Sequence, residues 1–337
     1  MLISGDKLIQ TLHYLPTRNL VYLNNAKVAC STVKKSLWLS ADSASYLPEV
    51  GPHNRLSAPF CKDLVAVATA GTIASATFFT VVRNPFVRVL SAYLDKIVGN
   101  PRDTFVWHPF ARRYRLSDAT VLSFGDFLRM IADEDPYLLD QHFAPQYVNT
   151  LSDFVSCDFV GHIEEMEGVV RFLGENGVAL DSHIPHPTGA ANLIDKYYGP
   201  DEINIVLDIY ANDFDLFGYS RSPHDISPAQ NAYTRNISRD VIDLLIGGYT
   251  SVDVESRRRC IDAVGRLRPA LLVDLNRLEV GAIDIEQLEV LSADAISGNI
   301  FNWKLAAVIA EELLKQNMVY EASSVAHRAK LLMYGDK

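Results

Sequence analysis

The chain has 337 residues, and its 41 acidic against 31 basic side chains give a formal net charge of −10 at pH 7, which argues against a nucleic-acid partner. The sequence contains no run of about eighteen apolar residues, so we expect no membrane span. Its four cysteines are far apart and form no Cys-x-x-Cys pair, a pattern typical of reduced thiols and a cytoplasmic location.

The charge is unevenly spread along the chain. Residues 1–100 carry a balance of +5, residues 101–220 carry −13 and residues 221–337 carry −2. The first hundred residues are therefore the part of the chain best suited to an anionic ligand.

A first strand, loop and helix are predicted near the N-terminus. Residues 19–25 place apolar and β-prone side chains between asparagines, as a short strand does. Small and hydroxyl residues then precede an apolar-periodic segment, which predicts a helix N-terminus with Lys27 in the loop and Lys34 and Lys35 in the first turns. Backbone N–H groups, hydroxyls and a lysine would form a P-loop-like anion cradle, although the Gly-x-x-x-x-Gly-Lys-Ser/Thr spacing is absent. An ordinary capped helix beside a lysine is the alternative.

A second unit of the same kind follows. Residues 42–61 predict a loop, and residues 64–70 a short helix. Residues 77–82 are aromatic and β-branched, which indicates a buried strand that ends on Arg83. Pro85 suits the first turn of a helix on which Arg88, Ser91 and Asp95 share one face. An arginine at a strand end beside a second arginine and a hydroxyl can hold a phosphate.

Two strands that each end in an anion-binding turn and a helix predict an α/β fold, with a central parallel sheet flanked by helices. Ligands of such sheets lie at the carboxyl ends of the strands, where both turns point. The pair of turns therefore predicts a ligand that is anionic at both ends.

The motifs resemble those of a known family. Residues 26–35 resemble the 5′-phosphosulfate loop of the carbohydrate sulfotransferases (sulfotransferase family 2), and residues 83–96 resemble their 3′-phosphate motif. Further similar segments follow in the family's order at 124–128, 141–146, 157–164 and 213–219, so the resemblance covers about residues 19–220. The chain differs from the family pattern at Ala26, Val33 and Phe143, where the family has proline, an aromatic residue and, in vertebrate members, tryptophan.

The resemblance implies a donor, 3′-phosphoadenosine 5′-phosphosulfate (PAPS), and transfer of its sulfuryl group to a hydroxyl or amine of a carbohydrate. The family pattern implies that the 3′-phosphate is held by Arg83, Arg88 and Ser91. It implies that the phosphosulfate end is held by Lys27, Ala29, Cys30, Ser31 and Thr32, with Lys27 stabilising the charge that develops on the bridging oxygen. No metal is expected, because the lysine and the backbone dipoles supply the positive field.

The base that takes the acceptor's proton is expected to be a histidine. His53 is the first candidate because it lies between the two motifs, where a related heparan sulfate-type enzyme has its base; an ordinary exposed loop histidine is the alternative. His142, inside a family-like segment, is the second candidate and could instead contact the acceptor. Asp140 or Glu164 would serve if neither histidine does.

His183-x-x-His186 has the spacing of a metal site, but it lies between prolines without a third ligand nearby, so we interpret it as loop.

The chain is expected to divide into a sulfotransferase domain at 1–222 and a helical C-terminal domain at 223–337. Helical patterns cover residues 240–246, 256–264, 285–291, 303–315 and 320–332, and the last two resemble one tetratricopeptide-type hairpin. We expect these helices to pack on the catalytic domain, where they would shape the acceptor cleft or mediate a homo-oligomer.

Two other functions remain open from the sequence. The protein could be a non-catalytic nucleotide-binding adaptor whose helical tail binds partners. A P-loop small-molecule kinase would need ATP, magnesium and a Walker loop, which the sequence does not contain. Vertebrate relatives carry a Golgi anchor and this sequence shows none, so we expect a bacterial, cytoplasmic member of the family.

Overall fold

The structure is a computed structural model. It describes residues 5–43, 51–54, 58–99, 104–137, 139–180, 189–228 and 237–250, and some residues elsewhere, among them 321–326. Apart from single residues, the helices predicted over 256–264, 285–291 and 303–315 lie outside the described residues, as does His183-x-x-His186. Of the helix predicted over 320–332, residues 321–326 are described and helical.

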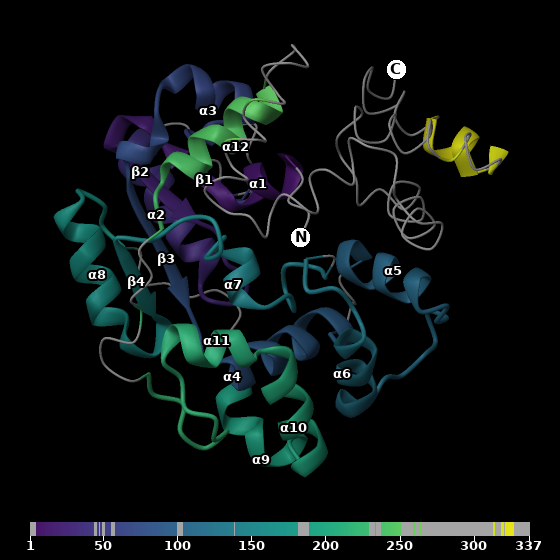
Figure 1. Cartoon of the computed structure of the whole chain (residues 1–337). Helices are drawn as coiled ribbons and strands as arrows, with labels where there is room; N and C mark the ends of the chain where they lie inside the picture. The colour runs from purple at the N-terminus through teal and green to yellow at the C-terminus, as the bar shows by residue number, and fades with distance from the viewer. Residues whose placement is uncertain are drawn as a thin grey trace.

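The centre of the fold is a four-stranded sheet in the order β1-β2-β3-β4 (Figure 1). Its strands are β1 (Leu12–Leu15), β2 (Leu20–Leu23), β3 (Thr77–Val82) and β4 (Phe159–His162). The last three are parallel, with Val21 opposite Phe78 and Thr80 opposite Val160.

The expected central parallel sheet is confirmed for β2, β3 and β4, but the sheet as a whole is mixed, because β1 pairs antiparallel with β2 at one edge. Only the short 3₁₀ turn Pro16–Arg18 and Asn19, at φ +46°, separate the two strands. A parallel pair needs a crossover of a dozen or more residues. A connection this short can only reverse the chain and join antiparallel strands. Strand β1 is not among the strands expected from the sequence.

Helices cover both faces of the sheet. On one face Tyr22, Phe79 and Val81 pack against α2 (Cys30–Asp42) and α8 (Met166–Glu175). On the other, Val21 and Phe78 pack against α3 (Leu64–Ala70) and α12 (Asp240–Thr250), with α1 (Gly5–Thr11) beside them. Successive strand residues point to opposite faces, and here both faces are buried, which explains the nearly unbroken apolar composition of β2 and β3.

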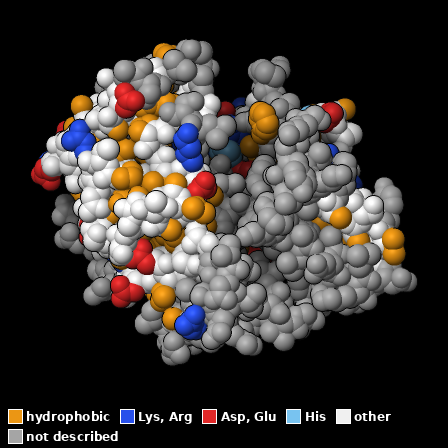
Figure 2. All heavy atoms as spheres, turned by 90° about the horizontal axis from the view of Figure 1, so that it is seen from above, with side chains coloured by type: hydrophobic (Ala, Val, Ile, Leu, Met, Phe, Trp, Pro, Cys, Tyr) orange, Lys and Arg blue, Asp and Glu red, His pale blue; other side chains and the backbone are white. Residues whose placement is uncertain are grey.

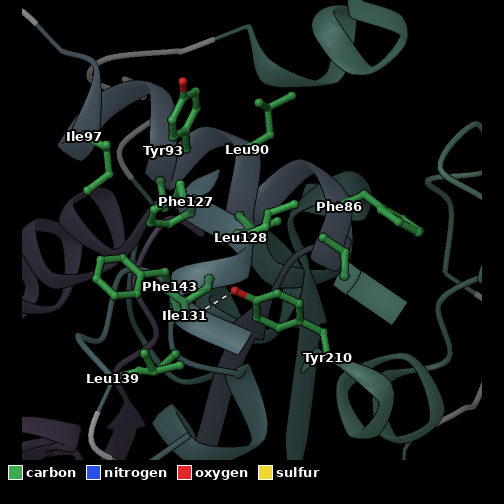
Figure 3. Close-up of a cluster of buried hydrophobic side chains, with 14 of the residues drawn as sticks. Phe86, Leu90, Tyr93, Ile97, Phe127, Leu128, Ile131, Leu139, Phe143 and Tyr210 are labelled. Atoms are coloured by element: carbon green, nitrogen blue, oxygen red, sulfur yellow. Dashed lines mark hydrogen bonds between the residues drawn. The ribbon is translucent and has the colours of Figure 1, made fainter. Parts of the chain in front are cut away.

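A third apolar cluster lies beyond the carboxyl end of β3 and is rich in aromatic rings. Figure 3 shows Phe86, Phe127, Phe143 and Tyr210 in it, with the Tyr210 hydroxyl donating to the carbonyl of Phe143 at 2.6 Å. The cluster draws on α4 (Pro85–Ala92), α5 (Thr104–Arg113), α6 (Phe124–Ala132), α9 (Ile194–Tyr197), α10 (Pro200–Ile209) and α11 (Ala211–Phe217). Phe86, Val89 and Leu90 of α4 belong to this cluster, together with Val82 at the end of β3.

The predicted strands over 19–25 and 77–82 and the predicted helices over 64–70 and 240–246 are confirmed. The helix after Arg83 is confirmed as well, with Pro85 in its first turn and the Asn84 side chain capping Phe86 N at 3.0 Å. Proline suits this position because an N–H group in the first turn has no acceptor within the helix, so its absence in proline costs no hydrogen bond.

The residues after the expected boundary at 222 pack onto the sheet. Asp243 of α12 accepts from the backbone N–H groups of Ile73 at 3.1 Å and Ala74 at 3.4 Å, and Arg239 donates to the carbonyl of Ala76 at 2.9 Å. Where one domain ends and the next begins stays a prediction.

On the face seen in Figure 2, described Lys and Arg side chains are interspersed with acidic and apolar ones. No helix in the described part of the chain is long and apolar enough to cross a membrane.

Candidate active site

The two predicted anion-binding turns meet at one edge of the sheet, because β2 and β3 are parallel neighbours and the turns follow their carboxyl ends. The guanidinium of Arg83 donates to the carbonyl of Lys27 at 3.2 Å, across 56 residues of sequence. Arg88 donates from Nε to the carbonyl of Ala26 at 2.9 Å. The second motif therefore holds the backbone of the first.

The loop itself has an uncommon backbone. Lys27 and Ala29 adopt positive φ values of 67° and 61°, although neither is glycine. Such conformations cost free energy and persist where the surrounding structure enforces them, often at functional sites. Ala29 is also the N-cap of α2, so Cys30, Ser31 and Thr32 form its first turn.

Gln146 joins the ends of the two strands. Its Oε1 accepts from the Arg83 N–H at 2.9 Å and from Asn25 Nδ2 at 2.9 Å, while its Nε2 donates to the Arg83 carbonyl at 2.8 Å. The residue is fully buried at the start of α7 (Gln146–Asn149). In the sequence, Gln146 lies in a family-like segment and has no expected role. Its hydrogen bonds to the backbone of Arg83, which only the folded structure shows, fix the position of that residue.

Arg88 lies beneath the loop. Its side chain is 1% exposed and makes three hydrogen bonds to backbone carbonyls, those of Ala26, Ala144 (2.8 Å) and Gln141 (2.9 Å). Ser91, three residues further along α4, is also buried. The guanidinium of Arg88 thus ties the loop to the 141–144 segment.

Lys27 forms an ion pair with a residue of the second motif. Its Nζ lies 2.9 Å from Oδ2 of Asp95, and the same oxygen lies 3.2 Å from Nζ of Lys96. Burial lowers the pKa of Lys27, and the charges of Lys96 and Arg83 lower it further, against the opposing effect of Asp95.

His53 contacts α2 through both ring nitrogens. Nε2 lies 2.8 Å from Ser31 Oγ and Nδ1 lies 3.3 Å from Lys34 Nζ. An ammonium can only donate, so Nδ1 accepts and Nε2 carries the proton of the neutral ring. Although the residue is exposed overall, loss of water around the ring and the charges of Lys34, His142 and Lys96 lower the pKa of His53 to about 4. His53 is therefore neutral at pH 7.

His142 is held by Asp140. Its Nδ1 lies 2.6 Å from Oδ1 of Asp140, and its backbone N–H donates to the same oxygen at 2.9 Å. Burial alone would raise the pKa of Asp140, but the charge and hydrogen bonds of His142, with the charge of Lys7, outweigh burial and lower it. Among the described residues nothing hydrogen-bonds the other ring nitrogen, Nε2. Such a dyad orients an imidazole and stabilises its protonated form.

The second carboxylate candidate, Glu164, is engaged on both oxygens. Oε1 accepts from the N–H of Asn84 at 2.9 Å, and Oε2 accepts from the hydroxyl of Tyr219 at 2.8 Å. Glu164 thus supports the turn between Arg83 and α4. No three His, Cys, Asp or Glu side chains in the described residues are grouped so as to hold a metal ion.

Comparison with known proteins gives a family. The model of the sulfotransferase family matches residues 10–220, more than half of the chain. Carbohydrate sulfotransferase 10 from Gallus gallus is 27% identical over 165 residues (42% of this chain, 46% of that protein), and the Homo sapiens protein is 28% identical over 167 residues (42% and 47%). Carbohydrate sulfotransferase 14 from Danio rerio is 29% identical over 220 residues, 59% of each chain. The chain spans about half the length of the first of these relatives, and no solved structure matches it significantly.

Proposed function

The chain belongs to the sulfotransferase family, and we propose that it transfers a sulfuryl group from PAPS to a hydroxyl or amine of a sugar-containing acceptor. The observation that carries this proposal is the contact between the two motifs, in which Arg83 and Arg88 hold the carbonyls of Lys27 and Ala26. A donor with phosphate groups at both ends matches two cationic turns at neighbouring strand ends.

Each end of the donor has its own residues. Lys27 and the backbone N–H groups around Ala29 to Thr32 bind the phosphosulfate, and the left-handed residues at 27 and 29 resemble the backbone nests that bind anions. Arg83 and Ser91 bind the 3′-phosphate. Arg88 acts indirectly, because its guanidinium is engaged by three carbonyls and holds the loop that binds the other end.

We assign the base to His142 rather than to His53. In His53 both ring nitrogens are hydrogen-bonded and the pKa is about 4, so the ring is a weak base whose lone pair already accepts from Lys34. In His142 the Nδ1 atom is fixed by Asp140 and Nε2 can accept a proton. His53 then has a different role, which is to position Ser31 and Lys34 at the start of α2.

The reaction is an in-line transfer. The acceptor oxygen or nitrogen attacks sulfur and a new bond forms as the bond to the bridging oxygen of the donor breaks. The electron pair stays on that oxygen, next to the 5′-phosphate, and the acceptor's proton passes to Nε2 of His142. Lys27 stabilises the charge on the leaving group, and fixed donors of this kind lower the barrier by about 3 kcal/mol each. Asp140 stabilises the imidazolium that results.

The test combines binding with turnover. Titration calorimetry with 3′-phosphoadenosine 5′-phosphate (PAP) is expected to show binding that Arg83→Ala weakens, and radiolabelled PAPS is expected to sulfate at least one member of a panel of glycans, with turnover lost in Lys27→Ala. Binding of PAP without sulfation of any glycan would favour the adaptor function. Binding of ATP with magnesium, and none of PAP, would point to a kinase. The cytoplasmic location, the C-terminal helical domain and the homo-oligomer stay predictions.

A further inference from the structure

The ion pair between Lys27 and Asp95 brings a carboxylate to the lysine that the proposed function assigns to the donor. The two side chains are 13% and 33% exposed, and Lys96, the other cation on Asp95 Oδ2, is 17% exposed. These are partly buried charges, which water and salt screen much less than surface charges. The two ammonium groups outweigh burial and lower the pKa of Asp95, so the carboxylate is charged throughout the neutral range.

A local irregularity of the helix positions Asp95. After α4 the backbone forms one π-helical turn, Tyr93–Ile97, closed by the Val98 N–H donating to the carbonyl of Tyr93 at 3.0 Å. Single π turns are rare and are found frequently at functional sites. Gly99 follows without space for a side chain, because a Cβ there would lie 2.4 Å from the backbone oxygen of Asp95. Glycine at position 99 is therefore compatible with this turn where a larger residue is not. The turn places Asp95 and Lys96 beside the phosphosulfate loop.

The position of this carboxylate conflicts with the proposed ligand. The phosphosulfate end of the donor needs the Lys27 amine, to which Asp95 is already bonded at 2.9 Å. Two anions around one amine repel each other, and this repulsion is stronger in a partly buried site than in bulk water. Asp95 contributes nothing attractive to an anionic donor.

Building on the proposed function, we propose that Asp95 is a positioning residue that competes with the donor for Lys27. It holds the Lys27 amine in the loop and gives it up when the phosphosulfate binds. The carboxylate thereby weakens the hold of the site on donor and product, and it keeps the buried amine protonated until the donor arrives. The groups that bear on Lys27 are Asp95, which favours its charged form, and Lys96 and Arg83, which oppose it.

The first experiment compares the PAP affinity of the full-length protein with that of Asp95→Asn, which keeps the side-chain shape and removes the charge. We expect roughly tenfold tighter binding, the change produced by about 1.4 kcal/mol. In a Lys27→Met background the same substitution is expected to tighten binding less than it does with Lys27 present, because only the direct repulsion between the carboxylate and PAP is removed and no amine has to be released. Unchanged or weaker PAP binding by Asp95→Asn overturns the proposal, as does an equally large effect in the Lys27→Met background. Asp215→Asn, which removes an exposed carboxylate paired with Arg221, is the matched control and is expected to leave PAP affinity unchanged.

The second experiment needs no nucleotide, so it separates failure of this inference from failure of the proposed function. Acylation of Lys27 by acetic anhydride at pH 8 is followed by peptide mass spectrometry, with exposed Lys62 as internal reference. Loss of the Asp95 charge lowers the pKa of Lys27 further, which increases the fraction of reactive free amine, so we expect several-fold faster acylation in Asp95→Asn than in the wild type. An equal or slower rate overturns the proposal. If the wild type binds no PAP but Lys27 responds in this way, the donor assignment is wrong and the control of Lys27 by Asp95 stands.

Discussion

Arg88 Nε donates to the carbonyl of Ala26 at 2.9 Å, so an arginine of the second motif lies directly beneath the loop of the first. Its neighbour Arg83 reaches the same loop at Lys27 but is less deeply buried. The two arginines of one motif therefore differ in environment. Their substitution is expected to affect fold stability and ligand binding to different extents.

Arg88→Met is expected to destabilise the fold by about 3–5 kcal/mol, because it leaves three carbonyls without their charged donor. Arg83→Met is expected to cost only about 1 kcal/mol of stability, since the Arg83 side chain makes one hydrogen bond to the described residues, to the carbonyl of Lys27. It should weaken PAP binding about a hundredfold through the lost phosphate contact. Urea unfolding and titration calorimetry on both variants measure the difference. A stable Arg88→Met protein that fails to bind PAP would show that Arg88 contacts the ligand.

His142→Asn is expected to lower kcat for sulfate transfer by about 10²–10⁴-fold with little change in the KM for PAPS, because a general base acts on the acceptor in the transition state. His53→Asn should do the reverse and raise the KM for PAPS more than it lowers kcat, since Ser31 and Lys34 lose their shared partner. Steady-state kinetics with saturating acceptor separates the two. If His53→Asn proves the slower enzyme at saturating PAPS, the base is His53.

Asp140→Asn is expected to lower kcat by about 10²-fold or more while PAP affinity stays close to that of wild type. The amide can still accept from Nδ1 of His142 but no longer stabilises the imidazolium. Lys7 provides the matched comparison: its charge also lowers the pKa of Asp140, but its amine donates to Asn149 at 3.0 Å, so Lys7→Met should affect unfolding more than kcat. A loss of kcat in Lys7→Met as large as that in Asp140→Asn would mean that the whole cluster, rather than the dyad, supports the reaction.

Asp213 makes stability depend on pH. The carboxylate is fully buried and accepts from the backbone N–H groups of Gln146 at 2.7 Å and Tyr147 at 2.9 Å; burial dominates and raises its pKa from 3.8 to about 6. Between pH 4 and 6 the unfolded chain has released this proton while the folded protein still binds it, so the free energy of unfolding falls as pH rises through that window, by about 3 kcal/mol from this group. Urea unfolding at pH 4, 5, 6 and 7 should show this slope in wild type and not in Asp213→Asn. Identical slopes would contradict the prediction.

The segment from β2 to α2 shows most clearly which features the sequence predicts. Strand β2, the loop lysine and the approximate start of α2 follow from local patterns, because an apolar run and its flanking residues act over a few positions. The cap itself was not predicted: a hydroxyl side chain was expected, but the N-cap of α2 is Ala29, which makes no side-chain cap hydrogen bond. The antiparallel β1 was missed, since a four-residue apolar strand leaves too few positions for a period to be recognised. The π turn at Asp95 was also missed. Regular α-helical spacing places Asp95 on the same face as Arg88 and Ser91, but the extra residue in the π turn rotates the direction of its side chain.

By itself the sequence indicated the two turns that follow β2 and β3, their order along a parallel pair of strands and the family of the chain. These properties follow from local backbone preferences and from motif residues close together in the chain. Only the tertiary structure decided what individual side chains do. It buried Arg88 among carbonyls, engaged both nitrogens of His53, oriented His142 on Asp140 and set Asp95 against Lys27. Burial and charge pairing depend on residues far apart in sequence, and they determine which of several identical chemical groups is structural and which is free to react.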